Sequence, residues 1–253
     1  MPGPIHILAT APLAERVLLP GDPGRALALA QLLLSAPKMF NHNRGLWGYT
    51  GDAIVDGRPL TIQSTGIGGP SAAIVISELA ELGARTFVRV GTCGSLTTGL
   101  RLGALVIVTE AICEDGTSRA LASADRVAPD PDLLARLIAA GRTAAAQQAA
   151  ASQQEVPAQR TAAAQQAVAV STDLFYDRPA GARDRWAAQG AAVVELEAAT
   201  VLALARRRGL RAAALLLVTE VPGDDGRRRR IDPEQLRTGE QRLGEVAADA
   251  VSA

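Results

Sequence analysis

Short apolar runs alternate with helix-like segments along most of the chain, and this alternation constrains the fold more than any other feature of the sequence. Apolar runs bounded by turn residues predict strands at 16–21, 59–66, 86–91, 104–112, 191–197 and 211–220. Helical patterns predict helices at 24–35, 70–83, 131–146 and 233–251, with one more between the last two strands. Such alternation favours an α/β fold, in which helices cover a mostly parallel or mixed sheet.

The size and composition of the chain agree with one such domain over residues 1–253. The chain is 48% hydrophobic and has a formal net charge of zero, so no basic bias favours nucleic acid or an anionic membrane as a partner. The N-terminus lacks the pattern of a signal peptide, and no uncharged apolar stretch reaches membrane-spanning length. The two cysteines, Cys93 and Cys113, suit a reducing compartment. We therefore expect a cytoplasmic protein.

An Ala/Gln-rich stretch at about 143–167 interrupts this pattern. The heptapeptide "TAAAQQA" occurs at 143–149 and again at 161–167. Two copies do not make a repeat architecture, which needs at least three. Alanine and glutamine favour helix, and Pro157 interrupts it. We expect a helical excursion on the surface, and its simplest interpretation is a neutral insertion.

Glycines and arginines gather where the predicted strands end. Gly21 and Arg25 follow the first strand, Arg89 lies inside "TFVRVG" ahead of Thr92, and Arg44 precedes a glycine in "NHNRGLWGYTG". Ligands of open α/β sheets bind beyond the carboxyl ends of the strands. Glycines there let backbone N–H groups approach a ligand, and arginine forks suit phosphate. These residues predict a phosphate site, whereas the missing GxGxxG and P-loop motifs disfavour a dinucleotide-dependent oxidoreductase.

Two carboxylates lie in the apolar run "AAVVELEAAT". Glu195 and Glu197 are two residues apart, so in a strand their side chains share one face. A buried charge needs a partner, which applies equally to Arg89. One carboxylate is expected to neutralise an arginine, and the other to accept hydrogen bonds from a ligand rich in hydroxyls. The alternatives are a structural salt bridge for Arg89 and a helix N-terminal acid for one glutamate.

Five motifs together resemble the hexameric nucleoside phosphorylases, the family of bacterial purine nucleoside phosphorylase and uridine phosphorylase. They are "LPGDPGR", "NRGLWGYTG", "RVGTCGS", "STDLFY" and "VELEAA", which occur in the family's order and at similar separations. The resemblance runs from about residue 4 to the C-terminus and is weakest at 143–167 and 221–232. It implies a single α/β domain with a central, twisted, barrel-like mixed sheet flanked by helices.

The resemblance also implies a role for individual residues. The phosphate-binding set would be Gly21, Arg25, Arg89 and Thr92, with Arg44 lent by a neighbouring subunit. The ribose would contact Leu196, Glu197 and a neighbour's His6, and the base would contact Phe175 and Glu220. Glu195 would support the site. No cofactor is expected, because inorganic phosphate is the co-substrate, and no metal cluster is visible in the sequence.

The implied reaction is reversible phosphorolysis of a nucleoside to free base and ribose 1-phosphate. Arg89 would position phosphate against an oxocarbenium-like sugar, and an acid would protonate the leaving base. Where purine enzymes carry an aspartate as this acid, the sequence has Glu220. The extra methylene displaces the carboxyl by about an ångström, which can cost about 10²-fold in rate if uncompensated. Asp224 or Asp225 is an alternative acid, and its arginine partner would come from 227–230.

The substrate remains open between purine and pyrimidine nucleosides. The glutamine and arginine with which uridine phosphorylases read uracil are not matched in "FYDRPAGAR", where Arg178 and Arg183 do not fit the spacing. Purine nucleosides are therefore favoured, with uridine or broad specificity as the alternative. A nucleosidase that uses water is disfavoured by the three arginines of the phosphate set. A non-catalytic nucleoside-binding homologue would bind without turnover. If His6 and Arg44 act across an interface, the active form is a homo-oligomer, and the family implies a hexamer built as a trimer of dimers.

Overall fold

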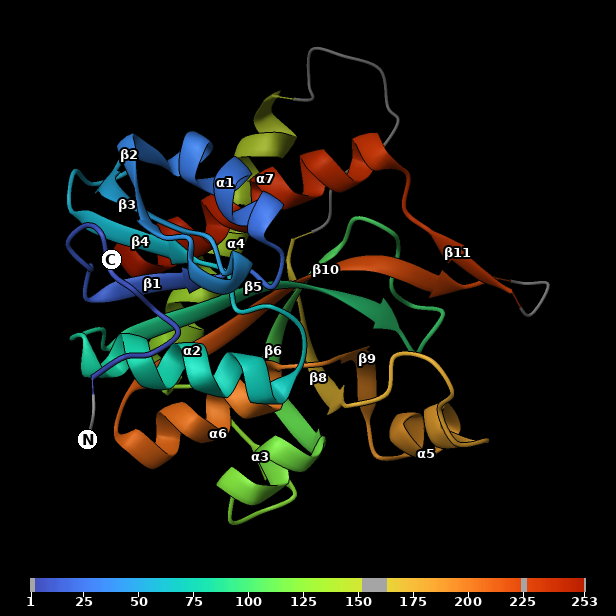
Figure 1. Ribbon diagram of the computed structural model, residues 1–253. Coiled ribbons are helices and arrows are strands. Elements are labelled where there is room, and N and C mark those ends of the chain that lie inside the picture. Colours follow the sequence, from blue (N-terminus) through green and yellow to red (C-terminus); the bar gives the residue numbers. More distant parts are fainter. Residues whose placement is uncertain (1–2, 152–162, 224–226, 253) are drawn as a thin grey trace.

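A computed structural model describes residues 3–151, 163–223 and 227–252 of the chain (Figure 1). One continuous sheet contains the strands β1 (Arg16–Leu19), β2 (Leu34–Asn41), β3 (Gly48–Ala53), β4 (Pro59–Gln63), β5 (Thr86–Ser95), β6 (Leu105–Glu114), β7 (Arg126–Val127), β8 (Gln165–Thr172), β9 (Ala191–Glu195), β10 (Arg211–Pro222) and β11 (Arg228–Arg230). The helices are α1 (Pro23–Leu33), α2 (Gly69–Glu81), α3 (Gly116–Leu121), α4 (Pro131–Ala151), α5 (Ala182–Ala188), α6 (Ala198–Arg208) and α7 (Pro233–Ser252). A short 3₁₀ turn, η1, spans Asn43–Gly45.

Part of the sheet closes into a barrel. Strand β5 pairs with β10, then β6, β8 and β9 follow in order, and β9 pairs back with β5. The ring is mixed, because β5–β10, β6–β8 and β8–β9 are parallel, whereas β6–β10 and β5–β9 are antiparallel. Strands β1, β4, β3 and β2 continue the sheet outward from β5. This confirms the expected α/β fold with a barrel-like mixed sheet.

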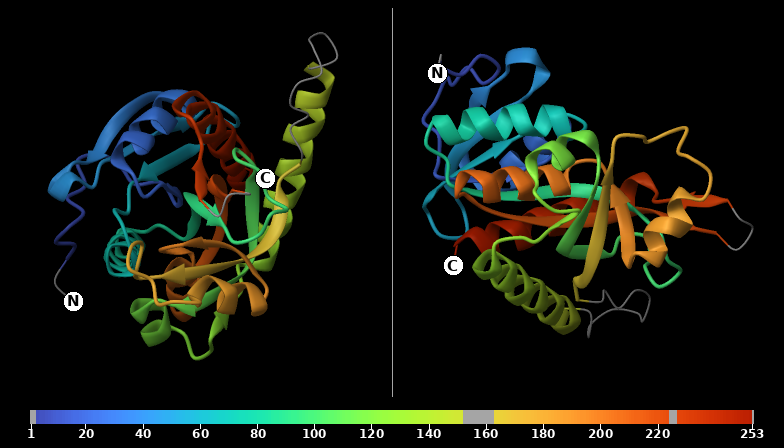
Figure 2. Two further views of the ribbon diagram at one scale, coloured as in Figure 1. Left: turned by 90° about the vertical axis from the view of Figure 1, so that its right-hand side faces the viewer. Right: turned by 90° about the horizontal axis from the view of Figure 1, so that it is seen from below.

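Helices cover both faces of this sheet (Figure 1). Helices α2 and α6 pack against one face through residues such as Ile76 and Leu202, and α3 packs against α6. Helices α1, α4 and α7 cover the other face through residues such as Leu29, Leu137 and Val246. Figure 2 shows α4 extending past the edge of the barrel. The buried apolar side chains therefore form two large cores separated by the strands, as an α/β sheet requires. A third, smaller cluster surrounds Trp186 of α5.

The alternation of strand and helix predicted most elements, and the exceptions have local causes. The predicted helix over 24–35 ends at Leu33, and β2 begins at the next residue. The sequence did not predict strands β2, β3, β7, β8 and β11 or the short helices α3 and α5. The predicted strand over 191–197 ends at Glu195, so the expectation that Glu195 and Glu197 share a strand face is wrong. Glu197 is instead the N-cap residue of α6.

The Ala/Gln-rich stretch is only partly helical. Its first heptapeptide, 143–149, lies in α4 as predicted. The end of the second copy, 165–167, begins strand β8, so the helical prediction is wrong there. Residues 152–162, with Pro157, lie outside the described residues. The same "QQA" is helical in one place and paired with β6 in the other, because strand pairing outweighs the small difference in local propensity.

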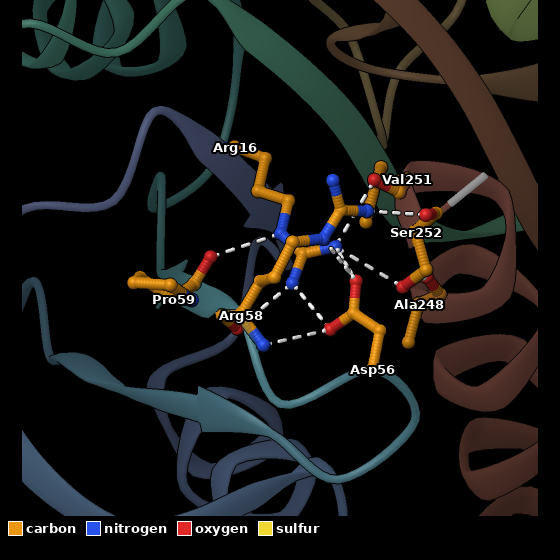
Figure 3. A network of polar contacts seen from close by, with 7 residues as sticks. All are labelled: Arg16, Asp56, Arg58, Pro59, Ala248, Val251 and Ser252. Atoms are coloured by element: carbon orange, nitrogen blue, oxygen red, sulfur yellow. Dashed lines mark hydrogen bonds and ion pairs between the residues drawn. The ribbon is translucent and has the colours of Figure 1, made fainter.

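A buried ion-pair network holds the start of β1 in place (Figure 3). Both terminal nitrogens of Arg16 donate to the carboxylate of Asp56 at 2.7 Å, and its Nε donates to the Pro59 carbonyl at 2.9 Å. The Arg16 Nη1 also donates to the Val251 carbonyl and the Ser252 hydroxyl, each at 3.1 Å. The network thus joins β1, the β3–β4 turn and the last turn of α7. None of the helices in the described part of the chain is long and apolar enough to cross a membrane.

Candidate active site

Arg89 occupies the centre of the candidate site, on the strand β5 that the barrel and the outer strands share. The residue is only 4% exposed, which is costly for a guanidinium unless acidic groups surround it. Its Nε donates to Glu195 Oε2 at 2.9 Å, and its Nη2 forms an ion pair with Glu197. A Cβ at Gly91 would lie 2.7 Å from the Arg89 Cζ, so the glycine leaves the space that the guanidinium occupies. Burial, pairing and strand geometry together fix this cation.

One nitrogen of Arg89 stays unpaired. The Nη1 atom is buried and has no hydrogen-bond partner among the residues that the structure describes. A buried, unpartnered donor costs free energy, so each such atom in a native protein needs an explanation, and a bound ion or ligand is one. Because guanidinium groups recognise planar or tetrahedral oxyanions, this donor fits phosphate.

Glu195 holds Arg89 in place and begins a helix. Besides Arg89, its Oε2 accepts the backbone N–H groups of Glu197 and Ala198, each at 2.9 Å, which belong to the first turn of α6. Its Oε1 accepts the hydroxyl of Ser171 at the end of β8, and the Ser171 oxygen accepts the Ala199 N–H at 2.8 Å. A carboxylate at a helix N-terminus is favoured by the free N–H groups and the helix dipole. The supporting role expected for Glu195 thus has a structural basis.

Glu197 lies between Arg89 and the glycine-rich turn before α2. Its Oε2 pairs with Arg89, and its Oε1 accepts the Gly68 N–H at 2.6 Å. Gly68 has φ +87, a backbone conformation that residues other than glycine rarely adopt, and this turn points the Gly68 N–H at the carboxylate. Burial raises the pKa of Glu197, and the nearby Glu195 and Asp115 raise it further against the opposing effect of Arg89. The intervening Leu196 is half-buried between β9 and α6.

Of the other predicted phosphate residues, Gly21 and Arg25 follow β1 and Thr92 lies within β5, and no hydrogen bond or ion pair joins them to Arg89 among the described residues. The Gly21 carbonyl accepts the Gly66 N–H at 3.0 Å, which joins two turns. Arg25, in the first turn of α1, donates from Nε to Glu240 of α7 at 2.7 Å. Thr92 is half-buried three residues beyond Arg89 on β5.

Arg44 and His6 lie in peripheral segments. Arg44 is exposed in the η1 turn with φ 57, and its guanidinium forms no ion pair within the described ranges. His6 Nδ1 lies 2.6 Å from Glu78 Oε1 of α2, and Glu78 Oε2 accepts the backbone N–H groups of His6 and Ile7. Within the described part of this chain, neither residue forms a hydrogen bond or an ion pair with Arg89.

A second charged cluster surrounds Glu220 near the end of β10. Its Oε1 accepts Arg228 Nε of β11 at 2.6 Å and lies 3.7 Å from Arg183 Nη2 of α5. Its Oε2 lies 3.4 Å from Arg230 Nε. Burial alone would raise the pKa of Glu220, but Arg228, Arg183 and Arg230 outweigh it, so the pKa lies below its usual value. Glu220 is therefore ionised at neutral pH.

Phe175 adjoins this cluster through Arg178. The Phe175 ring is 49% exposed, meets Tyr176 edge to face at 4.8 Å between centroids, and lies 5.7 Å from the guanidinium carbon of Arg178. Arg178 in turn lies within electrostatic range of Glu220, Arg183 and Arg228. In Figure 1, α5 and the β10–β11 hairpin lie at the same end of the barrel. An exposed aromatic face beside a charged edge suits a planar heterocycle.

Sequence reasoning missed several groups that complete the site. Ser171 lies in the quoted "STDLFY" motif but received no role, and nothing in the sequence linked Glu240 to Arg25 or Gly68 to Glu197. Arg228 and Arg230 were two of the four candidates near Glu220. The antiparallel pairing of β10 with β11 sets Arg230 opposite Glu220, but Arg228 makes the shorter contact, at 2.6 Å against 3.4 Å. Among the described residues, no group of three or more His, Cys, Asp or Glu side chains could hold a metal ion.

Comparisons with known proteins agree with this geometry. The profile of the phosphorylase superfamily matches residues 15–252. The guanosine phosphorylase of Halorubrum lacusprofundi is 38% identical over 81% of this chain and 77% of its own length. The uridine phosphorylase of Escherichia coli is 32% identical over 79% of this chain and 77% of its own length.

A solved structure with the same fold comes from Toxoplasma gondii. It is a purine nucleoside phosphorylase in complex with immucillin-H, with a TM-score of 0.82 and 25% sequence identity, and the match covers 100% of this chain and 96% of that one. The family profile covers nearly the whole chain and includes both charged clusters. The chain therefore belongs to the phosphorylase superfamily.

Proposed function

We propose that this protein is a purine nucleoside phosphorylase, which cleaves a purine nucleoside with inorganic phosphate to give the free base and ribose 1-phosphate. The single observation that carries the proposal is the buried Nη1 of Arg89, an unpaired donor on a guanidinium that Glu195 and Glu197 hold in place. The family of the chain and the named activities of its relatives support the same reaction.

Phosphate would bind against Arg89, in the middle of β5. Gly21, Arg25 and Thr92 would complete the phosphate site, and Arg25 would exchange its contact with Glu240 for one with phosphate. Glu197 would turn from Arg89 towards the ribose 2′- and 3′-hydroxyls once phosphate neutralises the arginine. Phosphate held against C1′ stabilises the positive charge that develops on the sugar as the bond to the base breaks.

The leaving base must be relieved of negative charge. Because Arg228, Arg183 and Arg230 keep Glu220 ionised, the free enzyme does not hold a proton there for general-acid catalysis. The arginine N–H groups around Glu220 can instead donate to the departing base. Glu220 as the acid stays a prediction that requires proton uptake when the nucleoside binds, and Phe175 supplies the stacking surface.

The active form would be a homo-oligomer, with a hexamer built as a trimer of dimers as the specific expectation. A groove of about 350 Å³ beside α2 is lined by His6, Ile5 and Ile74 among others, and these two isoleucines are 64% and 40% exposed. A second copy seated there would cover apolar surface and place His6 and Arg44 near its own site. The buried free thiols of Cys93 and Cys113 support the cytoplasm as the compartment.

The test is release of base from inosine, adenosine and uridine, each with and without inorganic phosphate. Phosphate-dependent cleavage of purine nucleosides supports the proposal. Uridine cleavage would move the specificity to the pyrimidine side of the family, phosphate-independent release would indicate a nucleosidase, and binding without turnover would indicate a nucleoside-binding homologue. If sedimentation shows that the active species is a monomer, an active site that takes His6 and Arg44 from a neighbouring subunit is refuted.

A further inference from the structure

The cluster around Glu220 contains more hydrogen-bond donors than its one carboxylate can accept. Arg228, Arg183 and Arg230 all face Glu220, at 2.6, 3.7 and 3.4 Å respectively. Each guanidinium carries five N–H donors and no acceptor. The cluster therefore offers donors to any group that binds beside it.

The arginines differ in how firmly the protein holds them. Arg228 is fixed, because its Nε donates to Glu220 and its Nη2 donates to the Ser95 carbonyl at 2.8 Å. Arg183, in the first turn of α5, has one ion pair among the described residues, the long 3.7 Å approach to Glu220, and its side chain is 37% exposed. Arg178 donates from Nε to the Leu174 carbonyl at 2.8 Å and lies beside the Phe175 ring.

Mutual repulsion among these arginines also favours binding of a group that accepts hydrogen bonds. Burial lowers the pKa of Arg183, and the neighbouring Arg228 lowers it further, despite the attraction of Glu220. Burial likewise lowers the pKa of Arg178, with Arg183 and Arg228 adding to the effect. A bound group that brings acceptor oxygens or nitrogens, or negative charge, would relieve this repulsion.

We propose that Arg183, assisted by Arg178, reads the six-position of the base and selects a 6-oxopurine over a 6-aminopurine. The inference rests on the proposed phosphorolysis. It assigns the choice of base in that reaction to a residue outside the five motifs that resemble the family. A 6-oxopurine presents two adjacent acceptors, O6 and N7, and an arginine fork donates to both at once.

A 6-aminopurine fits this surface less well. Its N6 amino group is a donor where the arginines also donate, so one of the paired contacts becomes two opposed N–H groups. Both oxygens of Glu220 already face arginines, which limits their capacity to accept the amino group. As the glycosidic bond breaks, negative charge spreads onto O6 and N7 of a 6-oxopurine, where the arginines also stabilise it.

The experiment compares kcat/KM for inosine and adenosine at saturating phosphate, because these nucleosides differ at the six-position and in the N1 proton that follows from it. A bidentate contact to O6 and N7 predicts a preference for inosine of about 10- to 100-fold. In Arg183→Gln, whose amide both donates and accepts, the ratio should fall at least about fivefold towards unity. The matched control is Arg185→Gln on the same helix, whose guanidinium approaches Glu114 at 3.5 Å instead, and its ratio should stay unchanged.

The outcomes separate this inference from the proposed function. If neither nucleoside is cleaved with phosphate, the proposed function fails and the inference with it. If both are cleaved with equal efficiency, or if the ratio survives in Arg183→Gln, phosphorolysis stands and the role of Arg183 is overturned. Competitive inhibition by free hypoxanthine and adenine gives the same ratio without turnover. Arg178→Gln, which should lower the ratio less, replaces Arg183→Gln if the latter melts well below the parent.

Discussion

Replacing Glu195 with glutamine should loosen the whole centre of the site, because this one side chain holds both Arg89 and the start of α6. The substitution keeps the size and shape of the side chain and removes its charge. Glu197 still pairs with Arg89 in the variant, so we expect a folded but less stable protein. The free energy of unfolding is therefore the quantity to measure first.

The hydrogen bonds on one oxygen set the expected magnitude. Glu195 Oε2 accepts three N–H groups, from Arg89, Glu197 and Ala198, each at 2.9 Å. A glutamine oxygen still accepts, but each bond loses its charge assistance, which is worth about 1 kcal/mol. The variant should therefore lose about 3 kcal/mol of unfolding free energy, close to the range of about 3–5 kcal/mol for breaking a buried ion pair. For a domain of this size, Tm falls by about 6–12 °C.

Denaturant unfolding and thermal melts without phosphate measure this loss. The matched control is Glu110→Gln, because Glu110 pairs with Arg126 at 2.5 Å while both side chains are 37% exposed. That variant should lose less than about 1 kcal/mol. If the unfolding free energy of Glu195→Gln lies within about 0.5 kcal/mol of the parent value, the argument that Glu195 offsets the cost of burying Arg89 is refuted. The KM of the Glu195→Gln variant for phosphate should rise, because Arg89 is then held less firmly.

Three further predictions follow from other contacts. Asp56→Asn should cost about 3–5 kcal/mol at neutral pH by leaving Arg16 buried without its carboxylate. Arg16 holds the pKa of Asp56 below its usual value, so the ion pair stabilises the fold fully above the unfolded pKa of about 4 and loses this effect as the pH falls further. The unfolding free energies of parent and variant should therefore converge in acid, and a difference that stays constant with pH would contradict the assignment. Gly69→Ala would place a Cβ 2.7 Å from Asp115 Oδ1 and should destabilise by about 1–3 kcal/mol in a melt, whereas an unchanged Tm would show that the turn can relax. Arg89→Lys should lower kcat/KM for phosphate by about 10²-fold or more in steady-state assays, because one ammonium cannot serve both glutamates and phosphate, and retained activity would place phosphate elsewhere.

The sequence predicted the layers of the fold because alternating strands and helices leave few architectures open. It did not reveal β8, whose first residues repeat a heptapeptide that is helical in α4. It also missed β2, whose five central residues are exposed, so the apolar signal of a strand is absent. In both places, pairing with a neighbouring strand determines the structure. Which strand will be that neighbour cannot be inferred from the local sequence.

The site was predictable where a residue type conflicted with its surroundings. Arg89 and the two glutamates stood out because charges in apolar runs need partners, and the structure joins all three. The pairing of Arg25 with Glu240 could not be predicted, because 215 residues separate them and neither is unusual in its segment. The ionised state of Glu220 also required the structure, since it follows from which arginines the β10–β11 pairing and α5 bring near.

The two clusters have opposite charge balance, and this arrangement suits bond cleavage between sugar and base. At Arg89, two carboxylates share one guanidinium, whereas at Glu220, three guanidinium groups face one carboxylate. Strand β5 connects them, because Arg89 lies in its middle and Gly94 pairs with Glu220 near its end. A nucleoside laid along this edge would place its ribose near the acidic cluster and its base near the basic one. When the glycosidic bond breaks, the sugar gains positive charge and the base gains negative charge, so fixed charges of these signs stabilise the transition state more than the bound nucleoside.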